Sequence, residues 1–333
     1  GQPWVGAAQI LPAAAGLGWS MMSGRHFEAS RTRALVETSL DSLAKSWSVP
    51  VASIVAVNNL GNAFGFATES LEGQVRFSPT NRLGLIAATR SACSEATALQ
   101  VDSAGYVIQD TADGADWLVV QAGNHETGSV DDLQALGKSA RLLVDASEWA
   151  GRMESSPGGN IIITRASSWG GPVSVCFVVF ADSPPSLTPQ KRQKLSPDPV
   201  LTALAVSALE QCGDVAARGR VQAETLETLG GQLAKVEGIT VHADFDRPRL
   251  PHLLTFSVAG IDAEALCIEL DRQGFAVGAG SACLSENSQS SHVLAAMGVE
   301  SSGGIRLSLP LSATAADLEA FGAAIGDAID AVR

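Results

Sequence analysis

Short apolar runs typical of buried strands alternate with amphipathic segments typical of helices through most of this chain. The clearest strand-like runs cover residues 84–89, 117–122, 141–145, 160–164 and 173–180. Apolar residues recur at helical spacing over residues 35–47 and, after a stretch that contains five prolines, over residues 200–236. Strand–helix alternation at this spacing predicts the α/β class, with a mainly parallel sheet covered by helices.

A second, smaller set of elements follows from residue 241. We expect strands at 252–258, 276–279 and 304–309, and helices at 263–273, 290–297 and 315–332. This order predicts a small C-terminal α+β domain. The expected organisation has three parts: an N-terminal segment that packs on the small domain (1–20), a large α/β domain (21–238) ending in a long helical linker (200–238), and the small domain (239–333).

Composition narrows the functional class. The chain has 333 residues, 46% of them hydrophobic, which suffices for a large buried core. The net charge is −13 with no long basic run, so nucleic acid is not an expected partner. No segment reaches the roughly 18 uninterrupted apolar residues that a membrane helix needs, and apolar residues 5–19 are interpreted as a packed segment rather than a signal peptide. The five cysteines form no CxxC pair, which predicts reduced thiols in a cytoplasmic protein and no metal site.

Two residues near the C-terminus are candidates for chemistry. Cys283 lies in a loop of small residues, Ala-Gly-Ser-Ala-Cys-Leu-Ser, where a thiol can be exposed as a nucleophile or be an unreactive side chain. Arg306 lies inside an apolar strand, where burying an unpaired guanidinium is costly. Its anionic partner is either a structural carboxylate or the carboxylate of a substrate.

The segment GSACLSENSQSSHVLAAMG, followed by GGIRLSLP, resembles the C-terminal signature of cysteine desulfurases in the class V aminotransferase superfamily. The resemblance implies a fold-type I pyridoxal-phosphate protein with a seven-stranded, mainly parallel sheet, and a homodimer whose site is completed at a two-fold interface. In that family the cysteine accepts sulfur as a persulfide and the arginine holds the substrate carboxylate. Cys283 and Arg306 match those positions.

The resemblance extends upstream more weakly. FATES resembles the turn whose threonine holds the cofactor phosphate, and Thr68 matches it. LLVDASEWAGR resembles the strand whose aspartate pairs with the pyridine nitrogen, and Asp145 matches that aspartate. GNHETGSVDDL resembles an Asn-Asn-Glu segment, with His125 in place of the second asparagine. SPDPV resembles a segment that reaches the phosphate across the dimer, which implicates Ser196.

The family pattern fails at the residue that binds the cofactor. Alignment of TRASSWGGP with the family's Ser-x-His-Lys segment places Ser168 at the lysine, Ser167 at the histidine and Arg165 at the serine. Serine cannot form the internal Schiff base or move protons as an amine. Glu148 replaces a glutamine and would repel the cofactor's phenolic oxygen, and the ring-stacking histidine falls near Ser91.

Three functions remain open from the sequence. The first is a degenerate relative without ordinary desulfurase activity, acting as a scaffold, a partner of an active desulfurase or a sulfur acceptor. The second is an enzyme that holds pyridoxal or pyridoxamine phosphate non-covalently, with His125 or another group as base. Its phosphate site would comprise Arg165 and Ser167 with Thr68 and Ser196. His125 and Arg165 are alternatively structural residues. The third is an active desulfurase that transfers sulfur from L-cysteine to Cys283 and recruits a distant lysine such as Lys194. In the first two of these functions the cofactor is either bound without a covalent bond or absent.

Overall fold

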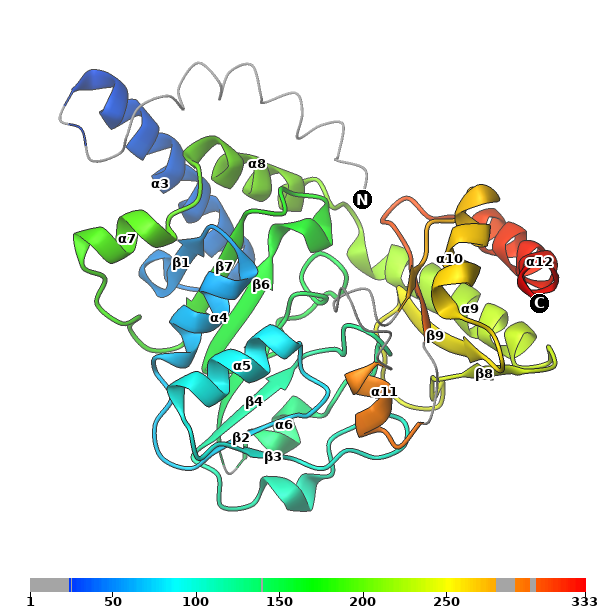
Figure 1. Cartoon of the computed structure of the whole chain (residues 1–333). Coiled ribbons are helices and arrows are strands. Elements are labelled where there is room, and N and C mark those ends of the chain that lie inside the picture. Colours follow the sequence, from blue (N-terminus) through cyan, green and yellow to red (C-terminus); the bar gives the residue numbers. More distant parts are fainter. Residues whose placement is uncertain (1–23, 25, 139, 280–290, 300–303) are drawn as a thin grey trace.

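The computed structural model describes residues 24, 26–138, 140–279, 291–299 and 304–333 (Figure 1). Its first part contains seven strands, namely β1 (Ile54–Val57), β2 (Val75–Phe77), β3 (Thr97–Ala98), β4 (Trp117–Gln121), β5 (Arg141–Asp145), β6 (Ile161–Arg165) and β7 (Cys176–Phe180). The helices of this part are α3 (Phe27–Trp47), α4 (Leu60–Thr68), α5 (Leu83–Ala92), α6 (Leu133–Leu136), α7 (Pro189–Leu195) and α8 (Pro199–Glu210). Short 3-10 turns lie at η1 (Val51–Ser53), η2 (Gln109–Ala112) and η3 (Ala166–Trp169).

The seven strands form one sheet in the order β1-β7-β6-β5-β4-β2-β3. Neighbouring strands from β6 to β3 are parallel, whereas β7 runs antiparallel to both β6 and β1. The predicted α/β fold with a seven-stranded, mainly parallel sheet is therefore confirmed. Parallel strands need long crossover connections, which the intervening helices provide.

Both faces of this sheet are covered, which explains the continuous apolar runs of its strands. Trp117 and Val119 of β4 pack with residues of α4 and α5 on one face. Leu118 and Val120 point to the other face and pack with residues of α6. Beyond them α3 and α8 pack together beside β7, around the fully buried Trp169.

The strand predicted at residues 84–89 is wrong, because these residues belong to helix α5. Leu85 and Thr89 are the buried residues of α5, and they are four positions apart on one helical face. The hydroxyl of Thr89 also donates a hydrogen bond to the Leu85 carbonyl, at 2.8 Å. A short apolar run does not distinguish a strand from a buried helix by periodicity alone.

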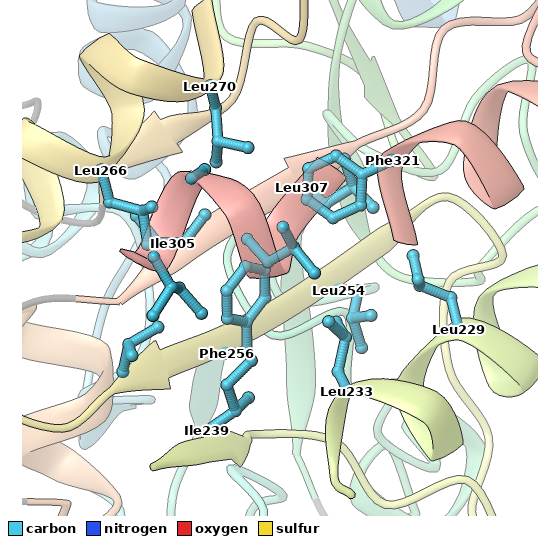
Figure 2. Packing of buried hydrophobic residues seen from close by; sticks show 14 of the residues in the cluster. Leu229, Leu233, Ile239, Leu254, Phe256, Leu266, Leu270, Ile305, Leu307 and Phe321 are labelled. Atoms are coloured by element: carbon cyan, nitrogen blue, oxygen red, sulfur yellow. The ribbon is translucent and has the colours of Figure 1, made fainter. Parts of the chain in front are cut away.

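A second, antiparallel sheet lies in the C-terminal part, in the order β10-β11-β9-β8. Its strands are β8 (Ile239–Val241), β9 (Leu253–Val258), β10 (Gly278–Ala279) and β11 (Ile305–Ser308). The helices here are α9 (Val215–Leu233), α10 (Ala263–Arg272), α11 (His292–Ala296) and α12 (Ala315–Val332). Figure 2 shows the core of this part, in which Phe256, Leu307 and Phe321 meet between the sheet and the helices.

Helices α8 and α9 connect the two sheets. The chain bends by 75° between them, near Gly213, whose φ of +67° lies in the left-handed region that favours glycine. Within the described ranges, no single helix is long and apolar enough to cross a membrane; α8 and α9 meet that length and composition test only when counted together across the bend.

Candidate functional site

The carboxyl ends of the parallel strands bring several of the candidate residues to one edge of the large sheet. Asp145 is the last residue of β5 and Arg165 the last residue of β6, while Arg82 follows β2 and His125 follows β4. Because β2, β4, β5 and β6 are parallel neighbours, these ends share one edge. Open α/β sheets bind their ligands at this edge.

Asp145 is buried, with 1% of the residue exposed, and both of its oxygens have partners. Oδ1 accepts a hydrogen bond from the Ser147 backbone N–H at 2.9 Å, and Oδ2 accepts one from Gln121 Nε2 at 3.3 Å. The cation that balances its charge is Arg82, whose Nε lies 3.3 Å from Oδ2. Asp145 is thus an ion-paired carboxylate within the protein's own side chains.

Glu148 lies at the centre of a second set of charge contacts. Its Oε1 contacts both Arg82 and Arg165, and its Oε2 lies 3.6 Å from Nε2 of His252. Burial alone would raise the pKa of Glu148, but the contact with His252 and the charges of Arg165 and Arg82 outweigh burial and hold this pKa well below its usual range. Glu148 is therefore an anion held by two guanidinium groups, and Arg82 joins it to Asp145.

Ser168, the residue at the position of the missing lysine, is turned toward the backbone. It lies on the 3-10 turn η3 and is 4% exposed. Its hydroxyl donates a hydrogen bond of 2.6 Å to the Arg165 carbonyl, and its own carbonyl accepts one of 3.0 Å from Arg152 Nε. Ser167 lies on the same turn and is half-buried. The turn therefore offers an alcohol engaged in a local hydrogen bond, and no amine.

His125 lies beside this cluster as a neutral imidazole. Its Nδ1 is 3.2 Å from the Gln121 carboxamide oxygen, so Nδ1 carries the proton and donates. Burial, and then the positive charge of Arg82, lowers the pKa of His125 well below its usual value. Arg306 of β11 reaches the same place and donates to the His125 carbonyl at 3.4 Å. Arg306 thus joins the small sheet to the loop after β4.

The structure does not place Thr68 where the sequence comparison expected it. Thr68 is the last residue of α4, whose N-terminal cap is Asn59. Its hydroxyl donates to the carbonyls of Phe64 and Gly65, within the same helix. The C-terminal end of a helix carries partial negative charge, which disfavours a phosphate. The assignment of Thr68 to a turn entering a helix is therefore wrong.

Ser196 lies apart from the described cluster. Ser196 caps the C-terminus of α7, and its hydroxyl donates to the Arg192 carbonyl at 2.8 Å. Ser196 belongs to the lining of a groove of about 1200 Å³ between α3, β1 and the Pro-rich segment before α8. Cys283 lies outside the described residues.

All five lysines of the chain are among the described residues, and each lies on a surface element. Lys191 and Lys194 are on α7, where the ammonium of Lys191 pairs with Glu69. Lys194 itself is exposed. The remaining three are also exposed and lie on α3, after α6 and after α9, at Lys45, Lys138 and Lys235. No lysine is among the residues that contact Asp145 or Glu148 in the described structure.

Sequence reasoning missed Arg82 and His252. Arg82 is the N-cap of α5, directly after the turn that follows β2. The available signal was a turn between a strand and a helix that ends in a cationic residue. Because residues 84–89 were predicted to be a strand, this turn was not recognised as the start of a helix. His252 comes from the segment that precedes β9, and no local motif marks it. Its burial, with 2% exposed, and its contact with Glu148 are visible only in three dimensions.

The described residues lack the partners that usually bind pyridoxal phosphate in proteins. That cofactor uses a lysine for its Schiff base and an acidic residue for its pyridinium nitrogen. Here the lysine position is Ser168, and both oxygens of Asp145 are already engaged by Ser147, Gln121 and Arg82. The cluster is therefore described without the cofactor.

Comparisons with known proteins agree with this architecture. The Aminotransferase class-V family model matches residues 197–321. The IscS-like cysteine desulfurase of Mycobacterium tuberculosis is 35% identical over 120 residues, which are 35% of this chain and 29% of that protein. Cysteine desulfurase IscS of Dictyoglomus turgidum is 41% identical over 73 residues, which are 21% of this chain and 18% of that protein. The matched region thus spans less than a third of these curated relatives.

Solved structures match over nearly the whole chain. A NifS-like protein from Rickettsia africae superposes with a TM-score of 0.84 at 17% identity, covering 99% of this chain and 97% of that one. An apo cysteine desulfurase from Thermococcus onnurineus superposes with a TM-score of 0.80 at 15% identity, covering 99% and 94%. At this level of identity the likeness establishes the fold, which is the fold-type I architecture that the sequence resemblance implies.

Proposed function

We propose that this chain, which matches the class V aminotransferase family model over residues 197–321 and resembles cysteine desulfurases, is a non-catalytic scaffold that binds a partner protein. The observation that carries the proposal is the charge cluster at the carboxyl edge of the large sheet. Two buried carboxylates, Asp145 and Glu148, are held there by Arg82 and Arg165, and the residue at the lysine position is Ser168. An alcohol cannot capture an aldehyde cofactor as a Schiff base.

The retained fold supports a role in binding rather than in chemistry. Both sheets keep well-packed cores, so the chain keeps its architecture although the lysine is missing. One fold can host many unrelated functions, so a chain that keeps this architecture without the cofactor's anchor can serve in binding. We therefore propose a homodimer, and a complex with an active cysteine desulfurase or with a sulfur acceptor, as the working form.

A sulfur-accepting role belongs to the same proposal and depends on Cys283. A cysteine can receive sulfur from a persulfide donor by attack of its thiolate on the outer sulfur, which releases the donor thiolate. This step needs no cofactor on the accepting chain. Incubation with an active cysteine desulfurase and L-cysteine, followed by mass spectrometry, should show a persulfide on the peptide that carries Cys283. A Cys283→Ser variant is the control, and absence of added sulfur excludes this part of the proposal.

The test of the central part uses the purified full chain. It is incubated with excess pyridoxal phosphate, reduced with borohydride and analysed by peptide mass spectrometry, and sulfide release from L-cysteine is measured with dithiothreitol. We expect no reduced adduct at the cluster and no sulfide. Coloured protein that borohydride cannot trap would favour a non-covalent enzyme. A trapped adduct at Lys194, with sulfide release, would contradict the proposal in favour of an active desulfurase.

The partner role has its own measurement. Sedimentation equilibrium should give twice the mass of 34.3 kDa if the chain is a homodimer. Addition of the chain to an active cysteine desulfurase should change the rate of sulfide release in a saturable way. A monomer that leaves this rate unchanged at every ratio would contradict the scaffold interpretation.

A further inference from the structure

Arg82 is ion-paired with Asp145, the carboxylate that a pyridinium nitrogen would need. We propose that the Arg82 guanidinium is a built-in replacement for the cofactor's ring nitrogen, so that a lysine restored at position 168 is not sufficient for cofactor binding. This inference rests on the proposed function, because it explains how the cleft stays charge-balanced without a cofactor. Arg82 would thus be a second feature that prevents cofactor binding, independent of the serine at position 168.

One side chain spans both carboxylates. Arg82 starts at the N-cap of α5 and reaches across the edge of the sheet, where its Nε lies 3.3 Å from Asp145 Oδ2 and its Nη2 contacts Glu148 Oε1. The Asp145 side chain is fully buried and only 17% of the Arg82 side chain is exposed. The contact with Asp145 is an ion pair in which Nε makes no hydrogen bond in the described structure, whereas Nη2 donates a hydrogen bond to Glu148.

Each oxygen of Asp145 also accepts a hydrogen bond. The Ser147 N–H and Gln121 Nε2 donate to its two oxygens. Gln121 is itself fixed, since its carboxamide oxygen faces His125 Nδ1 and accepts from Asn124 Nδ2 at 3.3 Å. A ring nitrogen could approach Asp145 only if Arg82 moved away from it.

Moving Arg82 would be costly. A buried carboxylate without a counter-cation carries a large desolvation penalty, and removal of one partner of a buried pair is strongly destabilising. Arg165 does not take the place of Arg82, because among the ion pairs of the described residues it pairs with Glu148 and not with Asp145. Burial keeps the pKa of His125 and of His252 below the usual value, so neither imidazole supplies the missing charge at neutral pH.

A mobile Arg82 would lead to a different result from a fixed one. If Arg82 were a mobile side chain resting on an accessible carboxylate, a cofactor would displace it easily. A single Ser168→Lys change would then restore the Schiff base. If Arg82 is the replacement, restoration requires Ser168→Lys together with removal of the guanidinium.

The experiment compares the wild-type chain, Ser168→Lys, Arg82→Ala and the double variant, each incubated with pyridoxal phosphate and reduced with borohydride. The readout is the labelled fraction of the peptide that carries position 168. We expect the double variant to be labelled at a cofactor concentration at least about tenfold lower than Ser168→Lys, a difference of about 1.4 kcal/mol in binding. Labelling of Ser168→Lys within about twofold of the double variant would overturn the inference. Labelling of a lysine of the wild-type chain such as Lys194, together with sulfide release from L-cysteine, would instead overturn the proposed function.

A second measurement needs no cofactor and covers the case in which a variant folds poorly. If Arg82 balances Asp145, Arg82→Met lowers the unfolding temperature, and adding Asp145→Asn recovers more than half of that loss. Arg141→Met is the matched control, because Arg141 pairs with the largely exposed Asp182. Arg141→Met should lower the unfolding temperature only slightly. Equal unfolding temperatures for Arg82→Met and Arg82→Met/Asp145→Asn would contradict the inference.

Discussion

Replacement of Glu148 by glutamine should destabilise the fold in a pH-dependent way. Glu148 is 11% exposed in its side chain and is the shared partner of Arg82 and Arg165. Glutamine keeps the shape but removes the charge, so Arg165 loses its anionic partner and Arg82 keeps only Asp145. Removal of one member of a buried ion pair costs about 3–5 kcal/mol. Because Arg165 is 31% exposed and partly hydrated, we expect the lower end of that range.

This loss converts into a measurable shift in melting temperature. Unfolding entropy near 2.1 cal/mol/K per residue gives about 0.7 kcal/mol/K for a chain of 333 residues. A loss of ~3 kcal/mol therefore lowers Tm by about 4 °C at neutral pH. Differential scanning calorimetry measures it directly. Glu69→Gln, which breaks the more exposed pair with Lys191, is the control and should cost less than about 1 kcal/mol.

The sign of the pH dependence follows from the lowered pKa of Glu148. A carboxyl group whose pKa is depressed by folding stabilises the fold above its unfolded pKa, near 4.3 for glutamate. That stabilisation disappears as the pH falls from there through the folded pKa. The difference in Tm between wild type and Glu148→Gln should thus be full at pH 7 and shrink below about pH 4. Equal Tm values at pH 7, or a difference that stays constant with pH, would refute the reasoning.

Three further predictions concern Asp131, Cys176 and Phe256. Burial raises the pKa of Asp131 to about 6, so ionisation of this carboxyl group weakens the fold as the pH rises from about 4 through 6. The Asp131→Asn variant can still accept the hydrogen bond from the Val107 N–H. In thermal scans this variant should be more stable than wild type by about 1–2 kcal/mol at pH 7 and equally stable at pH 4. Burial raises the pKa of the Cys176 thiol to about 12, so iodoacetamide at pH 8 should label it only after denaturation, by peptide mass spectrometry. Phe256 is fully buried and packs edge to face with Phe321. Phe256→Ala should therefore lower the free energy of unfolding in urea by about 3–5 kcal/mol. An unchanged unfolding midpoint would mean that this side chain does not stabilise the fold.

Much of the fold was predictable from the sequence because both faces of the large sheet are covered. The run at residues 141–145 coincides with β5, and the run at 117–122 contains β4. Such strands are apolar throughout, since neither face meets water. The helix α5 was mistaken for a strand because its apolar run is short, and at that length a buried helix has the same pattern.

The candidate site was predictable only where a residue lies beside its motif. Asp145 at the end of β5 and Ser168 on the turn after β6 follow directly from strand positions. The prediction for Thr68 was wrong because it relied on a local likeness to a phosphate-binding turn. The capping residue Asn59 marks the true start of α4, which places Thr68 at the end of that helix. Arg82 and His252 could not be assigned, because their partners Asp145 and Glu148 are distant in sequence and meet them only through the sheet order.

A crystal structure of the full chain grown with excess pyridoxal phosphate tests the central claim most directly. We expect continuous density for the Arg82 guanidinium between Asp145 and Glu148, and a serine hydroxyl at position 168 turned to its backbone partner. Density for a pyridine ring whose nitrogen lies on Asp145, with its aldehyde carbon joined to a side-chain nitrogen of this chain, would contradict it.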